Sequence, residues 1–192
     1  MRGDDEALAM ACPAPAAALM AAALPPGPAL ELCCGAGGIT RELARTGRRV
    51  LAVDQNQARL RANRENLAAV GLEGRVAQLC CDLRRAALRR RPGAKPFAAA
   101  VLDPDWSPPG RPPREWANAL SGLEPPLGDL LELALSLAPL AMLRLPRALA
   151  RQAAEELAPG LTVQELAPGG RRWQWLWLAR GAGRGQLTAT SC

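Results

Sequence analysis

Acidic residues lie at or near the ends of three successive strand-like segments, and their spacing has clear chemical consequences. Glu31 precedes the glycine-rich stretch 34–38, and Asp54 and Asp82 close the next two segments. In α/β folds a glycine-rich turn lets backbone approach a ligand, and an acid ending the second strand can accept hydrogen bonds from both ribose hydroxyls. A lone acid after a strand often only caps the next helix. Three such acids beside a glycine turn favour a site for a nucleoside-bearing cofactor.

The glycine turn also discriminates between cofactors. A nicotinamide-binding turn follows the pattern G-x-G-x-x-G, and here Gly35 and Gly37 are followed by Thr40 where the third glycine belongs. An acid ahead of the turn, Glu31, suits a cofactor with a cationic amino group, such as the methionine part of S-adenosylmethionine. The residues therefore favour S-adenosylmethionine over a dinucleotide.

With these features the sequence resembles the class I methyltransferases over about residues 29–180. The resemblance implies an α/β, Rossmann-like fold: a mostly parallel seven-stranded sheet with a C-terminal antiparallel hairpin and helices on both faces. It also implies that Glu31 contacts the methionyl amino group, Asp54 the ribose hydroxyls and Asp82 the adenine amine. Further residues implied to line the cofactor are Cys33, Gly35 and Gly37 at the methionine and ribose, Gln55 beside the adenine, and Leu83 on the ring.

The fourth strand-like segment ends in Asp103-Pro104-Asp105-Trp106. This stretch resembles the (Asp/Asn/Ser)-Pro-Pro-aromatic motif of methyltransferases that act on exocyclic amines of nucleobases. There, the first side chain and a carbonyl of the proline region accept the amine hydrogens, and the aromatic ring stacks on the base. Asp103, Pro104 and Trp106 match, whereas Asp105 replaces the second proline; these four are the predicted catalytic residues.

Together with CCGAGG and TGRRVLAVD, this motif most resembles the trimethylguanosine synthase-like (RNA cap guanine-N2) methyltransferases. The resemblance implies transfer to guanine N2 of RNA. Two alternatives stay open: a small-molecule amine or hydroxyl as acceptor, and a non-catalytic module that binds cofactor or RNA, with Asp105 marking an altered site. An RNA partner predicts binding that weakens steeply as salt rises.

The net charge of +6 arises within residues 51–114, which hold twelve basic and six acidic groups. The basic segment 84–95 and Trp116 are therefore candidate RNA contacts, although a basic run can also be a solvated helix face. Trp173, Trp175 and Trp177 alternate, which places them on one face of a strand. They form either a base-stacking platform or a stripe that packs the sheet against a helix.

Composition excludes several kinds of site. The six cysteines include two adjacent pairs without zinc spacing, and histidine is absent, so no metal site is expected. No apolar run approaches the roughly 20 residues that span a bilayer. The alanine-rich stretch 7–24 follows three acids and contains prolines, unlike a secretion signal, so we expect a cytoplasmic protein. The sequence leaves the oligomeric state open.

Strand-like and helix-like segments alternate, which predicts a parallel sheet covered by helices. Since the carboxyl ends of parallel strands meet at one edge, the acids should gather there. We expect residues 1–28 to form an N-terminal helix or loop, 29–180 the methyltransferase domain and 181–192 a flexible tail. The expected strands are 29–33, 50–54, 76–81, 98–102 and 140–145, and a hairpin at 161–179 turns at 168–170. The expected helices are 40–46, 57–70, 127–137, 147–157 and one from Asp82 to near Pro92.

Overall fold

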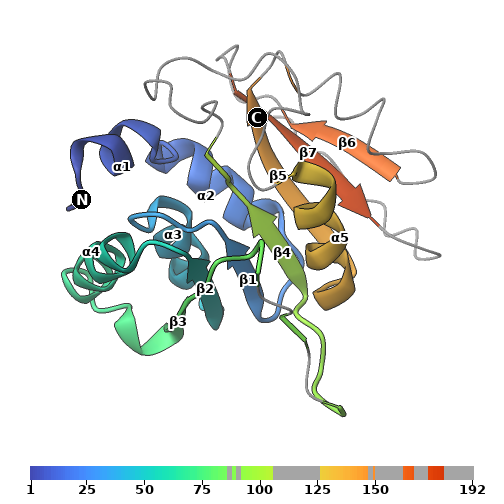
Figure 1. The fold of residues 1–192 in the computed structure, drawn as a ribbon, viewed down its shortest axis with the longest axis horizontal. Helices are drawn as coiled ribbons and strands as arrows, with labels where there is room; N and C mark the ends of the chain where they lie inside the picture. Colours follow the sequence, from blue (N-terminus) through green and yellow to red (C-terminus); the bar gives the residue numbers. More distant parts are fainter. Residues whose placement is uncertain are drawn as a thin grey trace.

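The computed structural model describes residues 1–85, 88–89, 92–105, 126–146, 149, 162–166 and 173–179, in which the strands form one sheet with helices on both faces (Figure 1). The elements in chain order are α1 (Asp5–Met10), α2 (Ala14–Ala23), β1 (Ala29–Leu32), α3 (Gly38–Arg45), β2 (Val50–Asp54), α4 (Gln57–Ala68), the 3₁₀ helix η1 (Glu73–Arg75), β3 (Val76–Cys80), β4 (Ala99–Leu102), α5 (Leu127–Leu137), β5 (Leu140–Pro146), β6 (Thr162–Leu166) and β7 (Trp173–Ala179).

Five of these strands are parallel, in the order β3-β2-β1-β4-β5. This arrangement confirms the prediction of a mostly parallel sheet. The strands β1 and β4 are buried along their whole length, because helices cover both faces of a parallel sheet. The direction of winding reverses between β1 and β4, and such a switch point leaves a crevice at the carboxyl ends of the two strands.

Beyond β5 the sheet continues with β7 and then β6, each antiparallel to its neighbour. The predicted turn at 168–170 lies outside the described residues. In β7 the three tryptophans are in register with alternate residues of β5: Trp173 with Pro146, Trp175 with Arg144 and Trp177 with Met142. The positions of their indoles lie outside what the structure describes, so the role of this stripe stays a prediction.

Two hydrophobic layers cover the sheet. On one face α5 packs through Leu130, Leu131 and Ala134 against Leu30 and Leu102 of the strands. On the other face α2 and α3 pack against the alternate strand residues Ala29, Val101 and Met142. Successive side chains of a strand point to opposite faces, so Glu31 shares the α2–α3 face with Ala29. Helices on both faces are therefore confirmed.

Two predicted segments differ from the structure. The helix expected after Asp82 is not formed in the part described, where residues 83–85 make a turn instead. The Asp82 carboxylate accepts a hydrogen bond from the backbone N–H of Arg84 (3.0 Å), and its carbonyl accepts from Arg85 N–H (3.0 Å). An aspartate bonded two residues ahead favours a turn over a helix. The helix predicted at 147–157 lies almost wholly outside the described residues.

The segment 1–28 forms the two helices α1 and α2 rather than a loop. Helix α2 is part of the core, since Ala17, Met20 and Ala21 are almost fully buried against α3 and the sheet. Within the described part of the chain, no helix has the length and apolar character that crossing a bilayer requires.

Candidate functional site

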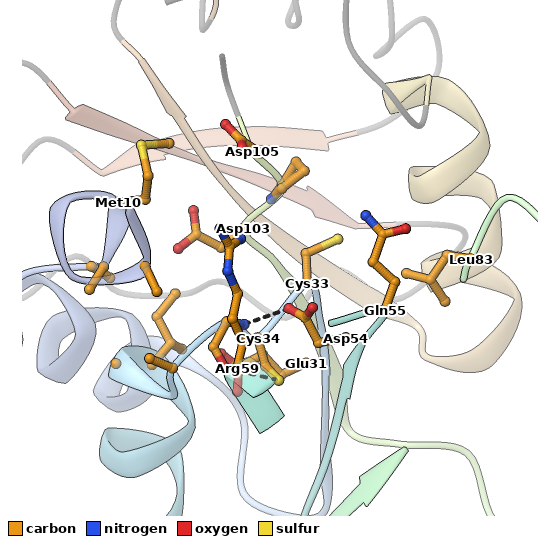
Figure 2. Close-up of a pocket in the computed structure, with 18 of the residues that line it drawn as sticks. Met10, Glu31, Cys33, Cys34, Asp54, Gln55, Arg59, Leu83, Asp103 and Asp105 are labelled. Carbon is orange, nitrogen blue, oxygen red and sulfur yellow. Dashed lines mark hydrogen bonds between the residues drawn. The ribbon is translucent and has the colours of Figure 1, made fainter. Parts of the chain in front are cut away.

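A pocket lies over the carboxyl ends of β1, β2, β3 and β4, and α1 with the residues after it forms one wall (Figure 2). It occupies the crevice that the switch between β1 and β4 creates. The structure brings ten predicted site residues into its lining: Glu31, Cys33, Gly35, Asp54, Gln55, Asp82, Leu83, Asp103, Pro104 and Asp105. Gly37 is not part of the lining, and Trp106 and Trp116 lie outside the described residues.

The turn after β1 adopts left-handed backbone conformations. The φ angles are 63° at Cys33, 51° at Gly35 and 89° at Gly37. A Cβ at Gly37 would collide with the Asn63 amide of α4, so this glycine serves the packing of α4 on the turn. A Cβ at Gly35 would meet nothing within 4 Å. Gly35 therefore borders open space where backbone can approach a ligand.

Glu31 is 1% exposed, although its side chain ends in an ionisable carboxyl group. Burial raises the pKa of Glu31 to about 8; hydrogen bonds from Thr40 oppose the shift, and the charges of Asp103 and Asp54 add to it. Within the described residues, Glu31 Oε2 has no hydrogen-bond partner. A buried acceptor without a partner is costly unless a ligand completes it. A cationic donor suits this position best, because it also stabilises the charged form.

Asp54 links the glycine turn to the start of α4. Its Oδ2 accepts from Gly35 N–H (2.7 Å) and its Oδ1 from Asn56 N–H (2.8 Å). Asn56 in turn caps α4 by accepting from the N–H groups of Ala58 and Arg59. Each carboxylate oxygen has a second lone pair. Asp54 is thus held in place with acceptor capacity left for a ligand in the pocket.

Asp82 is bound by the guanidinium of Arg84. Arg84 Nε donates to Oδ1 and Nη2 to Oδ2, both at 2.9 Å. These hydrogen bonds, with that from the Arg84 backbone, lower the pKa of Asp82 to about 2. Gln55 lies at the same end of the pocket, since its Oε1 is 3.5 Å from Arg84 Nη2. The carboxylate is ionised and oriented before any ligand arrives.

Asp103 pairs with Arg144 of β5, a residue that the sequence analysis missed. Arg144 Nε lies 2.9 Å from Asp103 Oδ1, and the two side chains are only 2% and 13% exposed. Arg144 Nη2 also donates to the carbonyl of Met10 at the end of α1 (3.0 Å). The sequence does hold a signal for this residue, because Arg144 is a charged side chain inside the apolar segment 140–146. A charge in a buried parallel strand needs a partner.

The wall formed by Ala7, Met10, Ala11 and Cys12 was also missed, as was Arg59 of α4. The sequence around 7–12 carries no motif that indicates a ligand. The cysteines that line this pocket are uncharged thiols. Burial raises the pKa of Cys12 to about 12 and raises those of Cys33 and Cys34 as well. These thiols are therefore not nucleophiles, and five cysteines of the described residues are free of disulfides.

The residues of this pocket fit S-adenosylmethionine. The unpartnered Glu31 oxygen can accept from an amino group, and the open space at Gly35 lets a ligand approach the backbone closely. Such a pocket at the switch point of this sheet defines a class I S-adenosylmethionine-dependent methyltransferase. Within that class the chain belongs to the RNA cap guanine-N2 methyltransferase family, whose family model matches residues 27–150. No curated protein sequence matches the chain.

Solved structures show the same fold. The O-methyltransferase TomG from Streptomyces achromogenes, in complex with S-adenosylmethionine, is similar with a TM-score of 0.60 and 17% identity over 94% of this chain and 92% of TomG. Magnesium protoporphyrin IX methyltransferase from Synechocystis PCC 6803, with bound S-adenosylmethionine, has a TM-score of 0.57 and 11% identity over 88% and 78%. TrmN from Thermus thermophilus has a TM-score of 0.57 and 26% identity over 87% of this chain but 48% of TrmN, so the chain spans about half of that protein.

Proposed function

We propose that this enzyme methylates an exocyclic amine of a nucleobase, namely guanine N2 in RNA. The observation that carries the proposal is the position of Asp103-Pro104-Asp105: it follows β4 and lines the same pocket as Glu31 and Asp54. The family description, RNA cap guanine-N2 methyltransferase, supports the same acceptor. S-adenosylmethionine supplies, when bound, an electrophilic methyl group on its sulfonium.

The cofactor is assigned to one half of the pocket. In this proposal Glu31 accepts from the methionyl amino group, Asp54 accepts from the ribose hydroxyls and Asp82 accepts from the adenine amine. Asp82 keeps acceptor capacity beside the Arg84 guanidinium, because each carboxylate oxygen has two lone pairs. The neighbouring residues Cys33, Gly35, Gln55 and Leu83 line the methionine, ribose and adenine positions. Gly37 leaves room for the Asn63 side chain of α4 to pack against the turn.

The acceptor base is assigned to the end of β4. The Asp103 carboxylate and the Pro104 carbonyl accept the hydrogens of the amine, which turns its lone pair toward the cofactor half of the pocket. Trp106 stacks on the base. Asp105 is exposed at the pocket rim, where it can take up the proton that the methylated amine releases. Holding two reactants in this way is worth roughly 7–11 kcal/mol of the barrier.

The basic segment 84–95 and Trp116 are proposed RNA contacts. Arg85 is well placed, since its Nε lies 3.7 Å from Asp82 Oδ2 at the pocket while its side chain is 86% exposed. Arg84 is committed to Asp82 by its two-pronged hydrogen bond and serves the pocket instead. A small-molecule amine or hydroxyl is the second candidate acceptor. Asp105 favours it, because replacing the second proline removes a rigid element that shapes a base-binding loop.

The proposed substrate predicts transfer to RNA that contains guanosine but not to RNA of the same sequence in which inosine replaces guanosine, since inosine lacks the N2 amine. Labelled S-adenosylmethionine in single-turnover assays measures the transfer, and digestion to nucleosides identifies N2-methylguanosine. Binding of the guanosine RNA should weaken steeply as salt rises. Equal transfer to the inosine RNA, or transfer only to small amines, contradicts the proposal.

Replacing Trp106 with alanine should slow methyl transfer roughly 10- to 100-fold, because stacking on a base is worth about 1–3 kcal/mol. The affinity for S-adenosylmethionine should stay unchanged, since the tryptophan is assigned to the acceptor. Single-turnover rates and calorimetric titration measure the two quantities separately. Trp106→Phe is the matched control and should keep most of the rate. A wild-type rate in Trp106→Ala rules out the stacking role.

A further inference from the structure

Arg59 is a positively charged side chain in the cofactor pocket that the assignments above do not use. It belongs to the first turn of α4, it lines the pocket, and its side chain is 20% exposed. We propose that Arg59 binds the carboxylate of the methionine part of S-adenosylmethionine. This inference rests on the placement of the methionine amino group at Glu31, as proposed above.

The charges around the pocket leave few other positions for an anionic group. Among the lining residues that the structure describes, Arg59 carries the one positive charge, and five others carry carboxyl groups: Glu31, Asp54, Asp82, Asp103 and Asp105. None of these five carboxyl groups attracts a ligand carboxylate, whereas the Arg59 guanidinium does. An amino acid holds its ammonium and carboxylate groups on one carbon atom, so the two binding groups must share one pocket. Glu31 and Arg59 meet that condition.

The guanidinium of Arg59 has donors left for a ligand. Its Nη2 donates to Glu6 Oε2 of α1 at 2.8 Å. Its Nε is buried 3.8 Å from Asp4 Oδ2, so the donors that a ligand can reach are the remaining N–H groups of Nη1 and Nη2. A guanidinium carries five N–H donors in a fork that fits a carboxylate with two hydrogen bonds. The bond to Glu6 uses one of these five donors, so others remain for a ligand carboxylate.

The position of Arg59 is also prepared before binding. Asn56 Oδ1 accepts from Arg59 N–H at 3.2 Å, which fixes the start of α4. The two acids of the α1 region, Asp4 and Glu6, hold the guanidinium near the pocket wall. Binding the cofactor carboxylate therefore requires no long movement of the side chain. The same contacts make Glu6 a competitor for the guanidinium.

A comparison of two ligands tests the inference. Decarboxylated S-adenosylmethionine keeps the amine, the sulfonium and the nucleoside but lacks the carboxylate. By calorimetric titration, the wild-type protein should bind S-adenosylmethionine roughly 10- to 100-fold more tightly than the decarboxylated ligand, as for a charged hydrogen bond. Arg59→Met should abolish this preference while leaving the affinity for the decarboxylated ligand unchanged. Arg61→Met, an exposed arginine of the same helix, should keep the wild-type preference.

Glu6→Gln provides a second test that leaves Arg59 in place. Removing the competing carboxylate should increase the preference for the carboxylated ligand, and an unchanged or smaller preference contradicts the inference. Arg59→Met with the wild-type preference also overturns it. A wild-type protein that binds both ligands equally excludes the role of Arg59 while the substrate proposal stands. Failure of the inosine comparison excludes guanine N2 and leaves Arg59 untouched.

Discussion

Replacing Arg144 with methionine is expected to lower the free energy of unfolding by about 3–5 kcal/mol, the usual cost of removing one partner from a buried ion pair. The substitution leaves the Asp103 carboxylate, 13% exposed, without its cation at 2.9 Å. It also removes the donor to the Met10 carbonyl, so the end of α1 loses its link to β5. Denaturant unfolding of the wild type and the variant measures the difference.

Arg61→Met is the matched control for this substitution, and as an exposed change it should alter stability by less than about 0.5 kcal/mol. The double variant Asp103→Asn/Arg144→Met should recover part of the loss, since the amide at position 103 carries no charge for Arg144 to balance. A loss below about 1 kcal/mol in Arg144→Met would show that the pair is weakly coupled. The role proposed for Asp103 depends on this pair, because Arg144 orients the carboxylate.

Glu31→Gln is expected to weaken S-adenosylmethionine binding at least about 30-fold, because truncating one partner of a buried charge pair costs about 2–5 kcal/mol. Glutamine keeps the size of the side chain and its contact with Thr40. In the role proposed for Glu31, it cannot neutralise the methionyl ammonium group. Calorimetric titration of both proteins measures the effect. Glu65→Gln, a half-exposed acid of α4 outside the pocket, should bind like the wild type.

The pH dependence of this affinity follows from the pKa of Glu31, which burial raises to about 8. Below that pH the Glu31 carboxyl of the free protein is neutral. To pair with the ligand ammonium group, Glu31 must first release its proton. The affinity of the wild type should therefore rise about tenfold for each pH unit between pH 6 and pH 7. It should be greatest near pH 8 and fall above it, because the ligand amino group then loses its own proton. Glu31→Gln should show no rising limb.

Stability without cofactor should change in the opposite sense. The pKa of Glu31 rises from 4.5 to about 8 on folding, so the folded state holds this proton more tightly. The stabilising contribution is complete below pH 4.5 and is lost as the pH rises through 8. The difference in stability between Glu31→Gln and the wild type should thus move in favour of the variant from pH 5 to pH 9. A constant difference would contradict the raised pKa.

The sequence predicted the parallel strands closely because its signals there are local. Continuous apolar runs end at the acids, and β2 spans the predicted residues, Val50–Asp54. Glu31, Asp54 and Asp82 reach one pocket because parallel strands present their carboxyl ends at one edge. One local prediction was wrong for an equally local reason, since Asp82 bonds to Arg84 and forms a turn in place of the expected helix. Gly37 accommodates Asn63, and its role toward the cofactor stays a prediction.

The sequence by itself therefore determined the class of fold, the cofactor and the edge of the sheet where the pocket lies. Only the tertiary structure decided how the pocket is closed and how its charges are balanced. Arg144 contacts Met10 across 134 positions of the chain, and Arg59 contacts Glu6 across 53. The raised pKa of Glu31 likewise arises from burial by distant elements. Periodicity and short motifs report neighbours along the chain, whereas these contacts exist only once the helices have packed on the sheet.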